Sequence, residues 1–425
     1  MHGTMKAARL YGFESTHGSR EVVRVDDVPI PDLATGEVLI RVLRAGLNHG
    51  DLHMREDAVQ YSPEVKTVPD LPMTIGHDGL GEVVEVGPDV SNVRVGDRVV
   101  VICSITCGFC KYCRTERQHL CQTKKTIGFL TKWGEGPAYL RRYKDGLWAE
   151  YCRVPAGNLV RLPQGANVNE MCKVSQINVG YRALKRARLH SGEVVLVNGA
   201  SGITGIGTVL SALVMGAAQV IAVARNPARL ERVKTIDPKR ISTVALGRGE
   251  SITNTVKELT NGQGASVLAE LAPGGIESTI ECIRNLEPGG RVALIAPNPE
   301  PLNLPLRYLM IRSIEFTSVT GRFAMDVEEL LLLVQRGVID TSHITTRYFP
   351  LADVNEALDY IDVARDPNFG PSRDHEIPRR PVFGTSTVCR GPTVELSCSR
   401  ISGHPPGTGK NGWIALLEIG KKHIG

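Results

Sequence analysis

The sequence lacks the segments that would direct a protein into or across a membrane. No window of its 425 residues approaches about 18 continuous apolar residues, the length that a membrane-spanning helix needs. The N-terminal segment MHGTMKAARLYGF has no apolar core of roughly 7–15 residues behind a basic lead, so it does not indicate a secretory signal. We therefore expect a cytosolic protein with no membrane partner.

An excess of charge of one sign is also missing. The 50 basic residues are nearly balanced by 45 acidic ones, and runs of like charge such as LRRYK are isolated. Nucleic-acid-binding proteins concentrate basic residues on one face, so this balance predicts an ordinary solvated surface and no nucleic-acid partner. A hydrophobic content of 42% and a length typical of two domains indicate a globular protein with a core in each domain.

The pattern of apolar runs divides the chain. Residues 5–168 contain short β-rich runs such as EVLIRVLR and GDRVVVI, separated by Gly and Pro, as in an all-β barrel-like domain. Residues 169–318 contain continuous apolar runs such as EVVLVNGA and QVIAVAR that alternate with helix-like segments. This alternation predicts a doubly wound parallel sheet with helices on both faces, so the predicted fold class is α/β.

The remainder of the chain falls into two parts. Residues 319–368 include two amphipathic stretches, MDVEELLLLVQRGVI and LADVNEALDYI, which we expect to return and pack on the first domain. In residues 369–425, Pro, Gly, Ser and Arg dominate and apolar runs are few. This composition predicts a disordered or atypical tail.

A glycine-rich turn follows the first apolar run of the second domain. EVVLVNGA leads into GASGITGIG, which places Gly199, Gly202 and Gly205 between a predicted strand and a predicted helix. Glycine is needed there because the backbone turns sharply and approaches a pyrophosphate, which the free N–H groups at the helix start bind. In this strand-turn-helix setting the glycines predict a dinucleotide site.

The end of the second strand predicts which dinucleotide binds. An acidic residue would normally hold the ribose 2′-hydroxyl of NAD at this point, but the chain reads Ala224, Arg225, Asn226. A guanidinium at Arg225 can bind a 2′-phosphate through charge-assisted hydrogen bonds, so we predict NADP(H), with Arg229 one turn further as a helper. The alternative is that Arg225 is a surface residue and the site accepts either cofactor.

Four cysteines lie close together in the first domain. The stretch CGFCKYCRTERQHLC sets Cys107, Cys110, Cys113 and Cys121 at metal-ligand spacing, which also accounts for much of the cysteine content in a reducing compartment. Four thiolates satisfy a tetrahedral zinc and leave no position for water or substrate. We predict one structural zinc per chain at this lobe.

These motifs together resemble the medium-chain, zinc-type alcohol dehydrogenase superfamily. The resemblance covers about residues 5–368 and includes the runs GHDGLGEVVEVG and VGDRVVV, the four-cysteine lobe, GYRALKRA and the glycine-rich turn, in that order. It implies an N-terminal GroES-like catalytic domain, a Rossmann domain and an active site between them. It also implies a small-molecule substrate and a homodimer or homotetramer.

The residues that match the family's catalytic metal ligands depart from its pattern. The ligand His of the family matches His77, followed by Asp78 in place of Glu, but the first ligand Cys falls on Asn48. The third ligand falls on Ser175, with Gln176 beside it. Neutral Asn and Ser oxygens are poor zinc ligands, so we predict that a catalytic zinc is absent.

The family's proton relay is interrupted as well. The family places a Thr or Ser hydroxyl at the position of Gly50 and a relay His at His53. Gly50 has no hydroxyl, so His53 would have to deliver a proton through water; the alternative is a solvated His without a catalytic role. His49 matches a residue that contacts the cofactor pyrophosphate in the family, and its alternative is an ordinary surface position.

Asn48 resembles the zinc-less quinone-reductase branch, in which a side-chain amide orients the substrate or the nicotinamide. We therefore predict NADPH-dependent reduction of a conjugated C=C or a carbonyl, in which hydrogen-bond donors replace the Lewis acid. Asn48, His53, His77 and Ser175 are the candidate catalytic residues, with Gln176 an alternative to Ser175. The alternatives are a zinc-dependent alcohol or aldehyde dehydrogenase with an altered metal site, and a cofactor-binding protein that has lost turnover.

Overall fold

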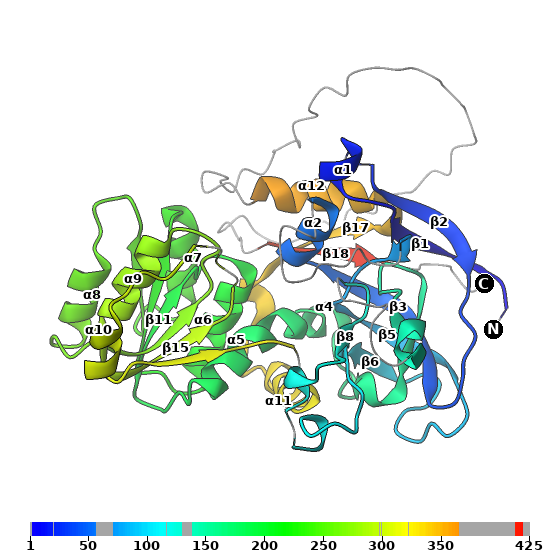
Figure 1. Cartoon of the computed structure of the whole chain (residues 1–425), viewed down its shortest axis with the longest axis horizontal. Helices are drawn as coiled ribbons and strands as arrows, with labels where there is room; N and C mark the ends of the chain where they lie inside the picture. The colour runs from blue at the N-terminus through cyan, green and yellow to red at the C-terminus, as the bar shows by residue number, and fades with distance from the viewer. Residues whose placement is uncertain are drawn as a thin grey trace.

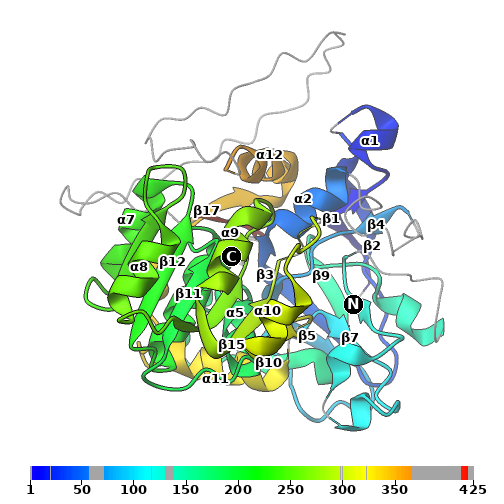
Figure 2. The ribbon, with the colours of Figure 1, turned by 60° about the vertical axis from the view of Figure 1, so that its left-hand side comes forward.

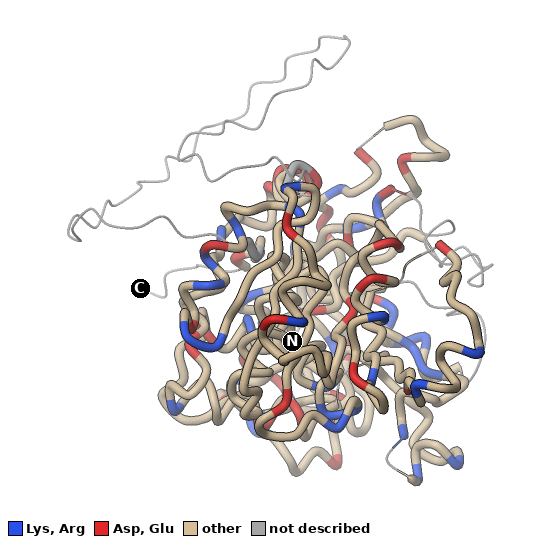
Figure 3. Tube along the Cα trace, turned by 90° about the vertical axis from the view of Figure 1, so that its left-hand side faces the viewer, with Lys and Arg blue, Asp and Glu red and all other residues tan. Residues whose placement is uncertain are grey.

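The computed structural model describes residues 2–19, 21–56, 71–115, 117–129, 138–296, 298, 300–321, 323–364 and 413–419. Figure 1 shows two lobes, one built on a parallel sheet flanked by helices and one rich in strands, with helices α5 (Val174–Arg186) and α11 (Ala324–Gln335) between them. Lys and Arg are interspersed with Asp and Glu along the trace (Figure 3). In the described part of the chain, no helix is long and apolar enough to cross a membrane.

The strand-rich lobe is built on two sheets. The larger has seven strands in the order β10-β6-β5-β3-β18-β17, with β9 also paired to β3. Its strands are β3 (Glu37–Leu47), β5 (Gly79–Val86), β6 (Arg98–Val101), β9 (Tyr151–Pro155), β10 (Leu159–Arg161), β17 (Thr345–Pro350) and β18 (Trp413–Glu418). The smaller sheet has the order β2-β1-β4 and contains β1 (Thr4–Leu10), β2 (Val23–Pro29) and β4 (Met73–Thr74). Most of β3 is buried, because it is an inner strand of the larger sheet.

Short elements complete this lobe. In its described residues, the four-cysteine lobe carries one pair of two-residue antiparallel strands and short helical turns. Helix α2 directly follows β3. These elements are α1 (Glu14–His17), α2 (His49–Glu56), β7 (Ser104–Ile105), β8 (Lys125–Thr126) and α4 (Val168–Met171). Because β3 leads into α2, the residues Asn48 to His53 are held at the end of a buried strand.

The other lobe contains a six-stranded sheet that is parallel throughout, in the order β13-β12-β11-β14-β15-β16. Its strands are β11 (Val194–Asn198), β12 (Gln219–Ala224), β13 (Ile241–Ala245), β14 (Ala265–Glu270), β15 (Leu286–Leu294) and β16 (Glu315–Ser318). Its helices are α6 (Ile203–Val214), α7 (Pro227–Ile236), α8 (Ile252–Leu259), α9 (Ile276–Arg284) and α10 (Leu306–Ile311). The predicted α/β fold class is confirmed.

The sheet is covered on both of its faces, as the continuous apolar runs predicted. Alternate residues of β11 enter different cores: Val195 and Val197 join one apolar cluster, and Leu196 joins another. After β13 the chain crosses to the other side of β11 and continues with β14. Ligands of open α/β sheets bind at such a reversal of strand order, which here lies between β11 and β14.

The chain after residue 319 contacts both lobes. Helix α11 packs on α5, where Tyr181 donates a hydrogen bond to Glu329 at 2.8 Å. Helix α12 (Val354–Ala364) packs on α2, where the buried Arg55 pairs with Asp359 at 2.7 Å. These contacts fix α2 and α5 relative to each other through the last part of the chain.

The tail differs from its prediction in one segment. Residues 413–418 form β18, which lies between β3 and β17 in the larger sheet and pairs antiparallel with Arg44 to Leu47 at the end of β3. Ala415, Leu416 and Leu417 of this strand are buried, because alternate residues enter apolar clusters on the two faces of the sheet. The predictions for residues 369–412 and 420–425 lie outside the described residues.

Candidate functional site

The glycine-rich turn lies at the carboxyl end of β11, and two of its glycines are required by packing. Gly199 has a φ of +91°, and a Cβ added there would lie 3.0 Å from the carbonyl carbon of Leu271. A Cβ on Gly205 would lie 2.2 Å from the carbonyl oxygen of Gly199. Any larger residue would push the turn away from β14 or push α6 away from the turn.

Gly202 is different, because little surrounds it. It is the N-cap of α6, no side chain caps this helix end, and an added Cβ would have its nearest neighbour at 3.9 Å. A ligand can therefore approach this backbone closely, and the first N–H groups of α6 are oriented to bind an anion. The three predicted glycines lie together, and the turn fits the pyrophosphate of a dinucleotide.

A buried polar pair beside this turn was not found from the sequence. Asn198, the last residue of β11, donates hydrogen bonds to both carboxyl oxygens of Glu270 at 3.0 and 3.2 Å. Glu270 ends β14 and also accepts a hydrogen bond from the Ala272 N–H at 2.8 Å. Burial raises the pKa of Glu270, and these hydrogen bonds oppose the rise. The Asn198–Glu270 pair joins β11 and β14 where the strand order reverses. In the sequence, the only feature that could have indicated this pair was a Glu near the end of the apolar run SVLAEL.

Arg225 is exposed directly beyond β12, where the sequence predicted recognition of a 2′-phosphate. The next residue, Asn226, caps α7 and accepts a hydrogen bond from the Arg229 N–H at 3.0 Å. The guanidinium and the N-terminus of α7 together place positive charge at this point. An anionic group on the cofactor ribose would be stabilised here.

The second part of the site is a hydrogen-bonded cluster around Asp78. This carboxylate is almost completely buried and accepts three side-chain hydrogen bonds. Asn48 Nδ2 donates at 2.9 Å, Ser175 Oγ at 2.8 Å and Gln176 Nε2 at 2.6 Å. Neutral donors at this distance stabilise a buried carboxylate without a cation.

His77 lies at the edge of the Asp78 cluster and is partly exposed. Its Nδ1 is 3.0 Å from Oδ1 of the buried Asp51, and its Nε2 is 3.2 Å from Nδ2 of Asn48. The ring of Phe129 packs against it with a centroid separation of 4.6 Å. Phe129 is a site residue that no sequence motif marked.

The hydrogen bonds determine the orientation of the Asn48 amide. The Gly50 N–H can only donate and bonds to Asn48 Oδ1 at 2.8 Å, whereas the carboxylate of Asp78 can only accept and bonds to Nδ2. The second hydrogen of Nδ2 points to His77 Nε2, and His77 Nδ1 faces Asp51. These contacts orient the His77 ring between the Asn48 amide and the buried Asp51 carboxylate.

This arrangement differs from the expected role of two site residues. Asn48 and Ser175 were predicted to present donors to a substrate, but the structure directs both donors to Asp78, and Gln176 with them. The physical reason is that a buried carboxylate attracts every nearby donor, since leaving it without hydrogen bonds costs several kcal/mol. The residues come together as expected, but they bind one another.

The predicted relay positions lie on α2. A Cβ on Gly50 would come within 2.9 Å of Asn48 Oδ1 and 3.1 Å of the Phe129 ring, so a Ser or Thr there would displace the amide or the ring. His53 is about one third exposed, with its Nδ1 3.3 Å from Glu56. His49 is exposed at the first residue of the helix.

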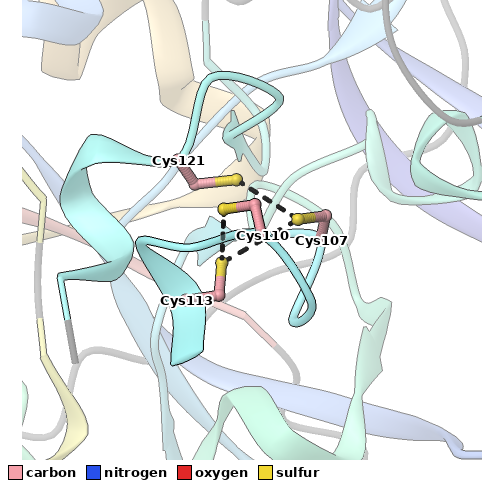
Figure 4. Close-up of side chains that lie close together, drawn as sticks. All are labelled: Cys107, Cys110, Cys113 and Cys121. Atoms are coloured by element: carbon pink, nitrogen blue, oxygen red, sulfur yellow. Dashed lines mark hydrogen bonds between the residues drawn. The ribbon is translucent and has the colours of Figure 1, made fainter. Parts of the chain in front are cut away.

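The four predicted cysteines converge, and Figure 4 shows their sulfur atoms facing one another. Their separations include 3.6 Å between Cys110 and Cys113, 3.7 Å between Cys121 and Cys107, and 3.9 Å between Cys107 and Cys113. Zn–S bonds of about 2.3 Å in a tetrahedron require about 3.8 Å between sulfurs, so the cluster fits one zinc. Burial tends to raise the pKa of the Cys107 thiol, but hydrogen bonds from the N–H groups of Phe109 and Cys110 lower this pKa to about 6. The lowered pKa favours the thiolate, which is the form that binds zinc.

No second cluster of this kind is present in the described residues. The four cysteines alone among His, Cys, Asp and Glu side chains form a group of three or more whose ligand atoms all lie within 4.8 Å of one another. His77, Asp51 and Asp78 do not meet this condition. The lobe is therefore the best-defined metal site of the described chain.

A parallel sheet with a glycine-rich turn at its strand reversal, joined to a strand-rich domain with a four-cysteine lobe, defines a two-domain, dinucleotide-binding oxidoreductase. Residues 34–164 match the family "Alcohol dehydrogenase GroES-like domain", and residues 204–336 match the family "Zinc-binding dehydrogenase". The chain belongs to the medium-chain, zinc-type alcohol dehydrogenase-like superfamily and is an NAD(P)-dependent oxidoreductase. The predicted resemblance is confirmed.

Relatives match most of the chain. It is 29% identical to an alcohol dehydrogenase of Geobacillus stearothermophilus over 357 residues, which cover 84% of this chain and 95% of the relative. It is 27% identical to a sorbitol dehydrogenase of Bacillus subtilis over 348 residues, which cover 81% and 91% respectively. The match thus extends across both domains.

Solved structures show the same arrangement. The structure of AibC superposes with a TM-score of 0.72 at 26% identity, covering 86% of this chain and 94% of AibC. The alcohol dehydrogenase TADH from Thermus sp. ATN1 superposes with a TM-score of 0.70 at 26% identity, covering 85% and 97% respectively. These similarities support the overall fold, in which a strand-rich lobe and a parallel-sheet lobe belong to one chain.

Proposed function

We propose that this protein is an NADPH-dependent reductase that delivers hydride to a conjugated C=C or a carbonyl of a small to medium apolar substrate without a catalytic zinc. The observation that carries this proposal is the cluster around Asp78. By the family resemblance, it occupies the place of the catalytic metal. Its polar atoms are already used by one another.

The residues at this place do not fit a catalytic zinc. Asn48 uses its oxygen to accept from the Gly50 N–H, and His77 Nε2 accepts from Asn48. Ser175 Oγ is bonded to Asp78. A catalytic zinc needs three good protein ligands and one open position, which this cluster does not provide. We therefore derive no step through a metal here.

The same cluster bears on the choice of substrate. Hydride addition places negative charge on the substrate, and the nearest donors, Asn48, Ser175 and Gln176, are directed to Asp78. A conjugated C=C needs less stabilisation than an isolated ketone, because the charge spreads into an enolate. We therefore favour the conjugated substrate within the proposed class.

The remaining residues have separate proposed roles. Bound NADPH supplies the hydride, and the first turn of α6 at Gly202 holds its pyrophosphate, with His49 as a further contact. Phe129 covers the ring of His77 and limits the access of water to that side of the cluster. His53, beside Glu56 on α2, delivers through water the proton that completes the reduction.

The cofactor preference rests on Arg225. Its guanidinium is exposed beside the N-terminus of α7 and no acidic residue follows β12, so a 2′-phosphate is attracted and a ribose hydroxyl lacks its usual acceptor. We expect kcat/KM for NADPH to exceed that for NADH by at least roughly tenfold. Equal values would show that the site accepts either cofactor.

Metal analysis combined with a substrate panel tests the main proposal. We expect one zinc per chain, held by the four cysteines, and oxidation of NADPH in the presence of conjugated enones. Two zincs per chain, with activity lost when one is removed, would overturn the zinc-free mechanism. Binding of NADPH without turnover of any enone or carbonyl would instead favour a protein that has kept only cofactor binding.

The four-cysteine lobe also bears on the cellular compartment of the protein. Its proposed zinc requires reduced thiols, and the cytosol keeps thiols reduced. We therefore propose a cytosolic location, which imaging of the tagged chain against a cytosolic marker would test. Enrichment of the tagged chain in a membrane fraction would contradict it.

We also propose a homo-oligomer, with an interface at the edge of the parallel sheet. Strand β16 is the last strand of the sheet, and the adjacent α10 exposes Leu306, Met310 and Ile311 by 81%, 71% and 64%. An unpaired edge beside exposed apolar side chains is typical of a surface that pairs with a second copy. Met310→Glu should reduce the sedimenting mass, whereas Met325→Glu, at a residue 63% exposed on α11, should not.

A further inference from the structure

A second glycine-containing loop lies at the reversal of strand order. Residues 271–275, with the sequence LAPGG, connect β14 to α9, and the last three of them are exposed. A Cβ added at Gly274 or at Gly275 would have no neighbour within 4 Å, so this backbone faces open space. Helix α9, which the loop enters, packs on β11, β14 and β15 (Figures 1 and 2). The loop therefore lies at the same end of the sheet as the glycine-rich turn that follows β11.

The side chain of Asn198, at the end of β11, holds both ends of this loop. Its Nδ2 donates to the two carboxyl oxygens of Glu270, directly before the loop, at 3.0 and 3.2 Å. The same nitrogen donates to Ser278 Oγ in the first turn of α9 at 3.1 Å, and that hydroxyl donates to the Gly275 carbonyl at 2.9 Å. Because an amide nitrogen carries two hydrogens, one can bond to Glu270 and the other to Ser278.

The backbone of the loop is joined to the strands on either side. The Leu271 N–H donates to the Asn198 carbonyl at 2.9 Å, and the Ala272 N–H donates to the Glu270 carboxylate at 2.8 Å. Directly after β15, the Ile295 N–H donates to the Glu270 carbonyl at 3.0 Å. Asn198 and Glu270 are only 1% and 3% exposed, so water cannot replace a hydrogen bond that either of them loses.

The strand order determines which half of a bound dinucleotide faces this loop. The adenosine ribose is expected at Arg225, directly after β12, and the pyrophosphate is expected at Gly202, after β11. The order of the strands continues from β12 and β11 to β14 and β15. An extended dinucleotide therefore places its other half, which carries the nicotinamide, over the ends of β14 and β15.

We propose that Asn198 is a positioning residue, which holds the loop of residues 271–275 as the surface against which the nicotinamide half of the cofactor binds. This role does not depend on the proposed preference for NADP(H), because the nicotinamide half is the same in NADPH and NADH. Loss of the Asn198 side chain should therefore weaken the binding of both cofactors by the same factor.

The adenosine side of the site does not need the Asn198 side chain. The Gly199 and Ala200 N–H groups donate to the Val223 carbonyl of β12 at 2.9 and 3.1 Å, so the turn is held to β12 by its own backbone. Arg225 follows the same strand. Ligands that contain only the adenosine half should therefore bind equally well with or without the side chain.

Binding measurements on the full chain separate the two halves of the cofactor. Titration calorimetry compares NADPH and NADH with 2′,5′-ADP and 5′-AMP, which lack the nicotinamide half. The variants are Asn198→Ala, Ser278→Ala and the conservative Ser278→Thr. Asn285→Ala is the matched control, because the Asn285 amide also donates two hydrogen bonds, at 2.8 Å each, but lies at the C-terminal end of α9. Thermal unfolding of each variant measures its stability.

We expect Asn198→Ala to weaken NADPH and NADH roughly tenfold each, and to weaken 2′,5′-ADP and 5′-AMP less than about twofold. Ser278→Ala removes one of the two anchors and should weaken both dinucleotides about threefold, whereas Ser278→Thr should match the unchanged protein. Asn285→Ala should lower the melting temperature and leave all four affinities unchanged.

The inference is overturned if folded Asn198→Ala binds both dinucleotides normally, since its hydrogen bonds would then serve stability alone. It is also overturned if Asn198→Ala weakens the adenosine ligands by the same factor as the dinucleotides. Should Asn198→Ala fail to fold, the Ser278 variants decide, and normal dinucleotide binding by Ser278→Ala would count against the role of the loop.

Discussion

The two places where this family binds metal differ in how their side-chain atoms are used. In the four-cysteine lobe, sulfurs 3.6–3.9 Å apart surround a point at the spacing that zinc requires. Around Asp78, an amide, a hydroxyl and a second amide donate to the carboxylate and leave no ligand atom directed at a common point. One place fits an ion, and at the other the same kinds of polar group are joined by hydrogen bonds, which is the basis of the proposed zinc-free mechanism.

The comparison bears on the proposed zinc-free site, because such a site must satisfy its buried acids in another way. Asp51 and Asp78 are buried, and without a cation each needs hydrogen-bond partners. Neutral donors supply them, and the absence of a side chain at Gly50 leaves room for the Asn48 amide, whose oxygen would be 2.9 Å from a Cβ at position 50. The changes at positions 48, 50 and 175 therefore support one another physically.

Substituting a cysteine of the four-cysteine lobe should have the largest effect on stability and zinc content. Cys110→Ser is expected to remove the single zinc and lower the melting temperature by more than about 10 °C, because structural zinc contributes on the order of 10 kcal/mol to small metal-dependent folds. Zinc analysis and thermal unfolding measure both. Cys103→Ser, a buried cysteine outside the cluster, should keep its zinc. A full complement of zinc in Cys110→Ser would contradict the assignment.

Removing the charge of Asp78 from the Asp78 cluster should have the next largest effect on stability. Asp78→Asn is expected to lower the free energy of unfolding by roughly 2–4 kcal/mol, since three donors lose a charged acceptor in a buried setting. Urea unfolding measures this loss. Asp27→Asn, at a side chain 60% exposed, is the control and should change stability by less than about 0.5 kcal/mol. Equal effects in both variants would argue against the cluster.

Introducing cysteines into the Asp78 cluster should create a second zinc site beside the four-cysteine lobe. The double variant Asn48→Cys with Ser175→Cys presents two sulfurs beside His77 and removes the amide that occupies His77 Nε2. We expect the zinc content to rise from one to two per chain, with each single variant remaining at one, because a stable site needs three good ligands. An unchanged zinc content in the double variant would show that the surrounding backbone cannot hold the ion.

The smallest expected effect is a difference in thiol titration. The pKa of Cys107 is lowered to about 6 by backbone N–H groups despite burial, whereas burial raises the pKa of Cys152 and of Cys172 to about 12. In chelator-treated protein, alkylation of Cys107 should therefore be half-maximal near pH 6 and decline below it, as the thiolate is protonated. Cys152 and Cys172 should stay unlabelled at pH 8. Mass spectrometry of the labelled peptides measures all three.

The sequence predicted best where the interacting residues are close in the chain. The glycine turn and the cysteine lobe are short segments whose spacing states their chemistry, and the structure brings their residues together. The Asp78 cluster joins residues 97 and 98 positions apart, so the sequence marked its members but not the bonds among them. Strand β18 was missed because a short apolar run in a polar tail gives no sign of the two strands that it separates.

The sequence by itself determined the α/β class, the dinucleotide turn and the cysteine ligands, because periodicity, glycine spacing and thiolate chemistry act over a few residues. Only the tertiary structure decided which groups Asn48, Ser175 and Gln176 bind. Burial forces each polar group at Asp78 to find a partner, and which partners are within reach depends on how β3, α2 and α5 pack against one another.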